Sequence, residues 1–115
     1  MKTKTINIPK AFSRYPSGRY ISDGPNCGEK FREKYLVSAL KDFDQVVIIL
    51  DDAEGYPRGY PSSFIEESFG GLIRLKKISR GDLLKKLKIV CNLDAFKIYR
   101  ENMYDAINEA ADPGA

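Results

Sequence analysis

Short apolar stretches predict four β-strands. Apolar and polar residues alternate over residues 3–9, and residues 46–50 form a continuous apolar run. A run of this length that is rich in β-branched residues is typical of a buried strand. Residues 87–91 predict the last strand. Residues 19–21 predict a short second strand, because they follow the turn signal Pro-Ser-Gly at 16–18.

Apolar residues spaced three or four positions apart predict three helices. The first covers about residues 27–42, the second runs from Ser63 to about residue 73, and the third begins at Asp94, which we expect to cap it. A short helical turn is predicted at 82–85. The resulting order is β-β-α-β-α-β-α. Strands that alternate with helices favour an α/β fold, here a mixed four-stranded sheet with helices packed on it.

Length and composition fit a single folded domain. The chain has 115 residues, and we place the domain at residues 1–111 and a disordered C-terminal tail at 112–115. No apolar run approaches the roughly 18 residues of a membrane span, and the N-terminus lacks an apolar signal-peptide region, so we expect a cytoplasmic protein. Cys27 and Cys91 match no metal-binding or redox spacing and are expected to be free thiols.

The chain contains no histidine. This excludes a Ser-His-Asp triad, a Cys-His pair and a His-ligated zinc or haem site, and it removes the usual general base near neutral pH. An enzyme that acted through carboxylates and Arg19 on a phosphorylated small molecule would lack an activated nucleophile. We therefore expect a protein that is not an enzyme, with no catalytic residue, metal ligand or cofactor.

Positive charge is concentrated between residues 74 and 88. Seven Arg and Lys side chains stand there against one acid, Asp82, whereas the rest of the chain has twelve basic and fifteen acidic residues. Such a segment can attract an acidic partner or a nucleic acid. The alternative is a solvated loop and helix face, which we favour because exposed lysines are ordinary.

Two adjacent serines open the second predicted helix. Ser63 and Glu66 have the spacing of a capping box, in which the hydroxyl accepts a backbone N–H of the first turn and the glutamate reaches back to the N–H of the cap. Ser62 would then precede the cap and stay free to accept a phosphate. Gly70 and Gly71 predict either a close approach to a neighbouring backbone or an early helix end.

Three acidic residues follow the central strand. Asp51, Asp52 and Glu54 could hold a divalent cation at the carboxyl end of a parallel strand. Their spacing matches no known calcium loop. We therefore favour the alternative, in which these acids form turns in a solvated loop.

The loops before the first two long helices combine arginine, glycine and tyrosine. Arg14, Arg19 and residues 24–28 could hold an anion, or the glycines could serve tight turns only. Exposed loop tyrosines suit protein recognition because they bury a large area at low entropic cost. The tyrosines in these loops are Tyr15, Tyr20, Tyr56 and Tyr60. If the loops converge, Arg19, Tyr60 and Ser62 form one surface, which we predict to be the working face.

Three sequence segments resemble the recurring segments of a known family and occur in the same order. They are Gly-Arg-Tyr at 18–20, Gly-Pro…Gly-Glu…Phe-Arg-Glu within 24–33, and Gly-Tyr-Pro-Ser-Ser-Phe…Glu-Glu…Phe-Gly-Gly-Leu within 59–72. Together with the element order, they resemble the STAS-like family of unknown function found in bacteria and their mobile elements. That family is related to the STAS domains of anti-sigma-factor antagonists. The resemblance implies a STAS-like α/β fold.

The resemblance also implies a switch. In STAS antagonists an Asp-Ser-Ser-Gly pattern carries a serine that a partner kinase of the histidine-kinase-like ATPase type phosphorylates, and the phosphate prevents binding to that partner. By motif position, Ser62 corresponds to the phosphorylated serine and Ser63 to its neighbour. This chain departs from the pattern, with Pro61 in place of the aspartate and Phe64 in place of the glycine.

We therefore predict a small bacterial or phage regulatory protein that binds a serine kinase or an anti-sigma-like protein and is switched by phosphorylation of Ser62. The predicted partner-binding residues are Arg19, Tyr20, Tyr60, Ser62, Ser63, Glu66, Glu67 and Arg74. The alternative function is a nucleic-acid-associated accessory protein that uses residues 74–88. No helix-turn-helix or zinc pattern supports it, so neither a nucleic acid nor a membrane is the expected partner.

Overall fold

The computed structural model describes residues 1–112, which are built around a sheet of three parallel strands. β1 (Thr3–Asn7), β2 (Gln45–Ile49) and β3 (Leu87–Val90) lie side by side in the order β1-β2-β3. The α/β fold and three of the predicted strands are confirmed, but the prediction of a mixed, four-stranded sheet is wrong. Apart from its first residue, the predicted tail at 112–115 lies outside the described residues.

Residues 19–21 belong to a tight turn and not to a strand. The Asp23 carboxylate accepts the backbone N–H groups of Arg19 and Tyr20, at 3.0 and 2.9 Å. Gly18 precedes this turn with a φ of +87°, a left-handed conformation that favours glycine. These local hydrogen bonds use the donors that a strand would have given to a neighbour, which explains why the predicted strand does not form.

Two long helices, each interrupted by a π-helical segment, connect the strands. The first consists of α1 (Gly28–Phe31), a π-helical segment (Arg32–Leu36) and α2 (Val37–Asp42). The second consists of α3 (Ser62–Ile65), a π-helical segment (Glu66–Gly70) and α4 (Gly71–Arg74). They are followed by α5 (Arg80–Lys86) and α6 (Lys97–Glu109). The remaining turns are a π-helical turn (Ile8–Phe12) and two 3-10 turns (Ile21–Asp23 and Asp94–Phe96).

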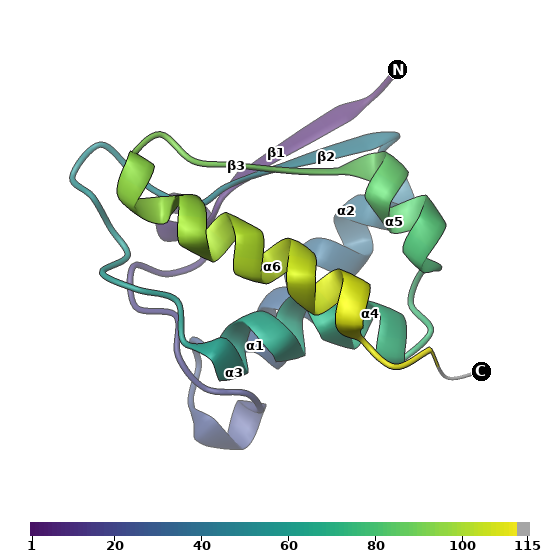
Figure 1. Ribbon diagram of the computed structural model, residues 1–115, viewed down its shortest axis with the longest axis horizontal. Coiled ribbons are helices and arrows are strands. Elements are labelled where there is room, and N and C mark those ends of the chain that lie inside the picture. The colour runs from purple at the N-terminus through teal and green to yellow at the C-terminus, as the bar shows by residue number, and fades with distance from the viewer. Residues whose placement is uncertain (113–115) are drawn as a thin grey trace.

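The predicted helices are therefore confirmed to within a few residues, with one local difference. Asp94 begins a 3-10 turn, and Phe96 occupies the N-cap position of α6 without a capping side chain. The helices gather on one side of the sheet (Figure 1).

This one-sided arrangement explains the burial pattern of the strands. On β2, Val46 and Ile48 are fully buried, whereas Val47 and Ile49 are partly exposed on the other face. On β3 the same alternation buries Ile89 and exposes Lys88. Parallel sheets are usually covered on both faces, so the partly exposed face is unusual for this strand arrangement.

Glycines allow the two long helices and α6 to approach one another closely. A Cβ added at Gly28 would lie 2.7 Å from the backbone oxygen of Phe64, and one added at Gly70 would lie 3.3 Å from the backbone oxygen of Ala106. The prediction that the Gly70-Gly71 pair marks a close approach is thereby confirmed, and the helix continues to Arg74.

α6 also reaches the edge of the sheet. β3 is an edge strand, and the N–H of Ile89 donates a hydrogen bond to the hydroxyl of Tyr104 at 3.0 Å. Both cysteines are free thiols, as predicted, with Cys27 buried and Cys91 partly buried. Within residues 1–112, no helix combines the length and apolar character needed to cross a membrane.

Candidate functional site

The N-cap of the second long helix lies two residues before Ser63, the cap that the capping-box pattern predicted. Pro61, in an extended conformation with ψ of 146°, is the N-cap, Ser62 is the first helical residue, and no side chain caps the helix. The predicted Ser63–Glu66 capping box is therefore wrong. Its glutamate is engaged elsewhere, because the guanidinium of Arg74 binds the Glu66 carboxylate at 2.9 Å and that of Arg19 binds it on the other oxygen.

Three arginines converge on the next residue, Glu67. The Glu67 carboxylate is almost fully buried and lies 2.6 Å from Nη1 of Arg32, 3.0 Å from Nη2 of Arg74 and 3.5 Å from Nη1 of Arg19. Arg32 is also buried, and its Nη1 donates to the backbone oxygen of Glu67 at 2.6 Å. We call these residues, together with Glu66, the arginine–glutamate cluster. The cluster joins the first long helix, the second long helix and the loop that carries Arg19.

The charges of this cluster stabilise each other. Burial acts to lower the pKa of Arg32, but hydrogen bonds and charges from Glu33 and Glu67 outweigh it and raise the pKa. Burial likewise acts to raise the pKa of Glu33, but Arg32 and Lys77 outweigh it and lower the pKa. Arg32 and the adjacent Glu33 therefore both favour their charged forms.

The loop held by Arg19 presents two apolar side chains to solvent. Tyr20 is 50 % exposed and Ile21 is 64 % exposed, although both are large. The loop backbone is fixed, because the N–H of Ile21 donates to the Glu29 carboxylate at 2.9 Å and the N–H of Glu29 donates to the backbone oxygen of Arg19 at 3.0 Å. A fixed, exposed apolar pair beside a charged cluster is typical of a protein-binding surface.

Ser62 lies next to this surface in a groove between the second long helix and α6. The groove has a volume of about 390 Å³, and its lining includes the carboxylates of Glu66, Asp105 and Glu109. Ser62 is exposed and Ser63 is partly buried. A phosphate on Ser62 would therefore enter a groove that already carries negative charge.

Tyr60 has a structural position and is not part of the exposed surface. Its side chain is 4 % exposed, and its hydroxyl donates to the backbone oxygen of Leu50 at 2.6 Å. Burial, and then the charges of Asp51 and Asp52, raise the pKa of Tyr60. Of the residues predicted to form the working face, Tyr60 is therefore buried, whereas Ser62 is exposed and Arg19 is partly exposed.

Replacing Tyr60 with phenylalanine should lower the free energy of unfolding by about 1–2 kcal/mol at neutral pH, because the carbonyl of Leu50 loses its buried donor. The raised pKa stabilises the fold fully below the unfolded tyrosine pKa of about 10, and this contribution is lost as pH rises above that value. The variant should therefore lose less stability than wild type between neutral pH and pH 11. Urea unfolding across this pH range tests the prediction, with Tyr15→Phe, at an exposed tyrosine, as control. If Tyr60→Phe and wild type lost equal free energy of unfolding between neutral pH and pH 11, the raised pKa of Tyr60 would be contradicted.

The acids after β2 hold loops together. The Asp51 carboxylate accepts the N–H groups of Asn92 and Leu93, at 2.7 and 2.8 Å. Backbone N–H groups, led by that of Tyr56, lower the pKa of Asp52 against the effect of burial. Within residues 1–112 no group of three or more His, Cys, Asp or Glu side chains gathers in a way that could hold a metal ion. Asp52 therefore forms a turn, as expected, by accepting the N–H groups of Glu54 and Tyr56. The expectation of a solvated loop is wrong for Asp51 and Asp52, because both are buried and Asp51 joins the segments that follow β2 and β3.

Arg14 and Arg19 do not form a joint anion site. Arg14 contacts Asp52 and Glu54, each at 3.3 Å, whereas Arg19 contacts the glutamates of the second long helix. The guanidinium of Arg14 also lies 4.6 Å from the ring centre of Tyr56. Each arginine is thus neutralised by a different pair of carboxylates.

Much of the positive charge at residues 74–88 is used inside the molecule. Arg74 binds the cluster, Lys77 lies 3.3 Å from Glu33, and Arg80 donates to backbone oxygens of α6 and the residue after it. Lys86 donates to two backbone oxygens at the end of α2. Lys76, Lys85 and Lys88 make no ion pair with the residues that the structure describes, so the segment is less available to phosphates than its sequence indicates.

Of the predicted partner-binding residues, the structure brings Arg19, Tyr20, Ser62, Glu66 and Arg74 to one region of the surface. Ser63 is partly buried, and Glu67 and Tyr60 are buried. The exposure of Ile21 beside Tyr20 was not predicted, because the sequence pattern predicts a strand at residues 19–21. The turn residues around it, Gly18 and Asp23, were the available signal.

Comparison with known families identifies the fold. No curated protein and no solved structure matches the chain. The family described as STAS-like domain of unknown function (DUF4325) matches residues 27–92, which is more than half of the chain and includes both long helices, β2 and β3. The chain therefore belongs to the family of STAS-like domains of unknown function.

Proposed function

We propose that this STAS-like domain is a regulatory module that works by binding another protein. The binding surface, which we call the recognition face, consists of Arg19, Tyr20, Ile21, Ser62 and Glu66. The observation that carries the proposal is the exposure of Tyr20 and Ile21 on a loop that Arg19 ties to the second long helix. Aromatic and aliphatic anchors in the centre of a polar rim supply most of the energy of many protein interfaces.

The proposed partner class rests on the resemblance to anti-sigma-factor antagonists and on the groove beside Ser62. We propose an ATP-dependent serine kinase or an anti-sigma-like protein, which places the interaction in the cytoplasm where ATP is available. Ser62 is exposed and makes no capping hydrogen bond, so its hydroxyl is accessible to a kinase. The role requires no catalytic residue, metal or cofactor in this chain. Nothing in the arrangement of Lys76, Lys85 and Lys88 favours the nucleic-acid alternative.

Replacing Tyr20 with alanine should weaken the complex with the purified partner about ten-fold or more, as expected for an exposed aromatic anchor that the partner covers on binding. The partner is first obtained by affinity capture from the native host, and the affinity is then measured by isothermal titration calorimetry. Ile98→Ala is the matched control, because Ile98 is 58 % exposed on α6, outside the recognition face. Equal affinities for the two variants would contradict the proposed surface.

Replacing Ser62 with aspartate should weaken the same complex about ten-fold, whereas Ser62→Ala should leave it within about two-fold of wild type. The physical reason is the added negative charge beside Glu66, Asp105 and Glu109. Phosphopeptide mass spectrometry of the protein from its native host tests whether the modification occurs. A Ser62→Asp variant that binds as tightly as wild type would reject the switch while leaving the recognition face in place.

A further inference from the structure

We propose that a second site, between α2, α4 and α5, binds a small amphipathic carboxylate: an apolar chain that ends in one acidic group. The pocket has a volume of about 420 Å³, which lies in the range of roughly 300–1,000 Å³ that is usual for small-molecule sites. None of its lining residues belongs to the recognition face. This inference therefore goes beyond the proposed function and does not rest on it.

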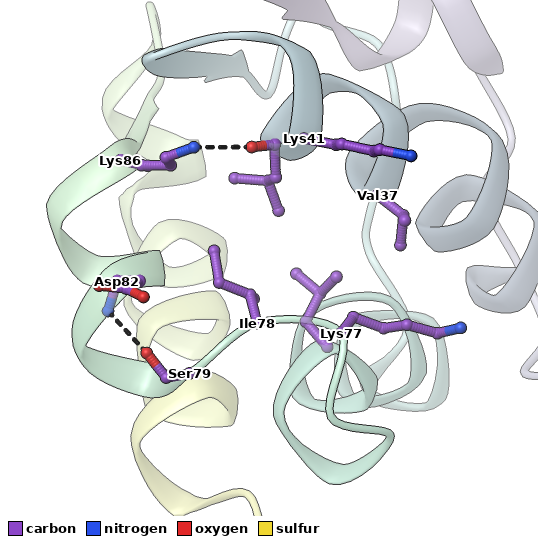
Figure 2. Close-up of a pocket in the computed structure, with 9 residues that line it drawn as sticks. Val37, Lys41, Lys77, Ile78, Ser79, Asp82 and Lys86 are labelled. Atoms are coloured by element: carbon purple, nitrogen blue, oxygen red, sulfur yellow. Dashed lines mark hydrogen bonds between the residues drawn. The ribbon is translucent and has the colours of Figure 1, made fainter.

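The floor of this pocket is apolar. Leu40 and Leu72 are buried core residues, and Val37 and Ile78 are partly buried beside them. Figure 2 shows Val37 and Ile78 on opposite sides of the hollow, one from α2 and one from the loop between α4 and α5. An apolar chain placed here would remove these side chains from water.

The hollow exists because the chain turns sharply after α4. Lys76 adopts a left-handed conformation with φ of 57°, and the N–H of Lys77 closes the helix end on the backbone oxygen of Leu72 at 2.9 Å. The loop then passes Ile78 along the pocket before Ser79 caps α5 by accepting the N–H of Asp82 at 3.2 Å. The wall formed by residues 76–79 is therefore fixed by hydrogen bonds at both ends.

Three lysines give the rim its positive charge. Lys86 Nζ donates to the backbone oxygen of Leu40 at 2.8 Å (Figure 2). It also donates to the backbone oxygen of Phe43 at 3.2 Å, which leaves one of its three N–H donors free. Lys41 makes no ion pair within the described chain, and Lys77 has only the half-exposed Glu33 at 3.3 Å. These ammonium groups can bind a carboxylate at the mouth of the pocket.

One acid on the lining sets the orientation of the ligand. Asp82 lies on the α5 side, whereas Lys41 and Lys77 lie on the opposite side of the hollow (Figure 2). A carboxylate head would be repelled by Asp82 and attracted by Lys41 and Lys77. The ligand is therefore expected to place its head toward α2 and its chain over Ile78.

A titration of the full-length protein with sodium octanoate tests the proposal, followed through the backbone amide resonances by NMR. Saturable shifts should appear at Val37, Leu40 and Ile78. Acetate carries the charge without the chain and 1-octanol carries the chain without the charge, so each should bind at least about five-fold more weakly than octanoate. Absence of saturation with octanoate, or equal affinity for octanol or acetate, would overturn the proposal.

Variants of exposed residues separate this site from general charge attraction. Lys41→Glu combined with Lys77→Glu should weaken octanoate binding about ten-fold, and Asp82→Asn should strengthen it about two-fold. Lys85→Glu is the matched control, because Lys85 lies on α5 but does not line the pocket. If Lys85→Glu weakened octanoate binding as much as the double variant does, the site would be overturned. Tighter binding of the peptide acetyl-Glu-Leu-Leu-Glu-amide than of octanoate would also overturn it, because the occupant would then be a segment of a partner protein.

Discussion

Replacing Glu67 with alanine should lower the free energy of unfolding by about 3–5 kcal/mol, a large fraction of the roughly 5–15 kcal/mol that stabilises a typical domain. The cause is Arg32, whose guanidinium is buried and lies 2.6 Å from the Glu67 carboxylate. Without that carboxylate a buried positive charge keeps only the half-exposed Glu33 and a backbone oxygen as partners. Urea denaturation followed by circular dichroism measures the loss.

The neighbouring glutamate supplies a matched control. Glu66 contacts Arg19 and Arg74, as Glu67 does, but its side chain is 48 % exposed. Glu66→Ala should therefore cost at most about 1 kcal/mol. A loss of that small size for Glu67→Ala would contradict the role assigned to burial. Combining Arg32→Met with Glu67→Leu should restore most of the stability, because it removes both buried charges together.

Replacing Gly28 with alanine should destabilise the protein by about 3 kcal/mol, at the upper end of what overpacking usually costs. The added Cβ would lie 2.7 Å from the backbone oxygen of Phe64 and 3.1 Å from the backbone nitrogen of Ser68. Both atoms belong to the second long helix, so no side chain can rotate to make room and the two helices must move apart. The thermal midpoint and the urea midpoint should both fall.

At Gly81, the same replacement of glycine by alanine should have the opposite effect on stability. It lies in α5, and a Cβ added there would meet no heavy atom within 4 Å. Gly81→Ala should therefore raise stability by about 0.5–1 kcal/mol, since alanine restricts the unfolded chain more than glycine does. If Gly28→Ala also raised stability, the close packing of the two helices would be incorrect.

Strands and helices were predictable where burial dictates the pattern of residues. The apolar run of β2 and the helical spacing of the two long helices reflect which side chains face the core, and these predictions hold. The strand at 19–21 failed because Asp23 binds two nearby N–H groups, a local interaction that apolar periodicity does not detect. Because of this error, four strands were predicted where the sheet has three.

The candidate site was harder to predict because its side chains are placed by distant partners. A capping box assumes that Glu66 turns back to its own helix, but Arg19, 47 residues earlier, and Arg74 bind it instead. Tyr60 lies in a loop whose composition is typical of exposed tyrosines, yet its hydroxyl donates to the carbonyl of Leu50, directly after β2 and ten residues earlier. Neither pairing leaves a signal in a single sequence.

The hydroxyl of Tyr104 also occupies a backbone donor on the edge of the sheet. An uncovered edge strand is a template on which another chain can add a strand and begin to aggregate. At Ile89 the donor that such a chain would use is already bound. Helix α6 therefore blocks strand addition at this position of β3, and a chain that has lost the helix would expose the N–H of Ile89 on an edge strand rich in apolar residues.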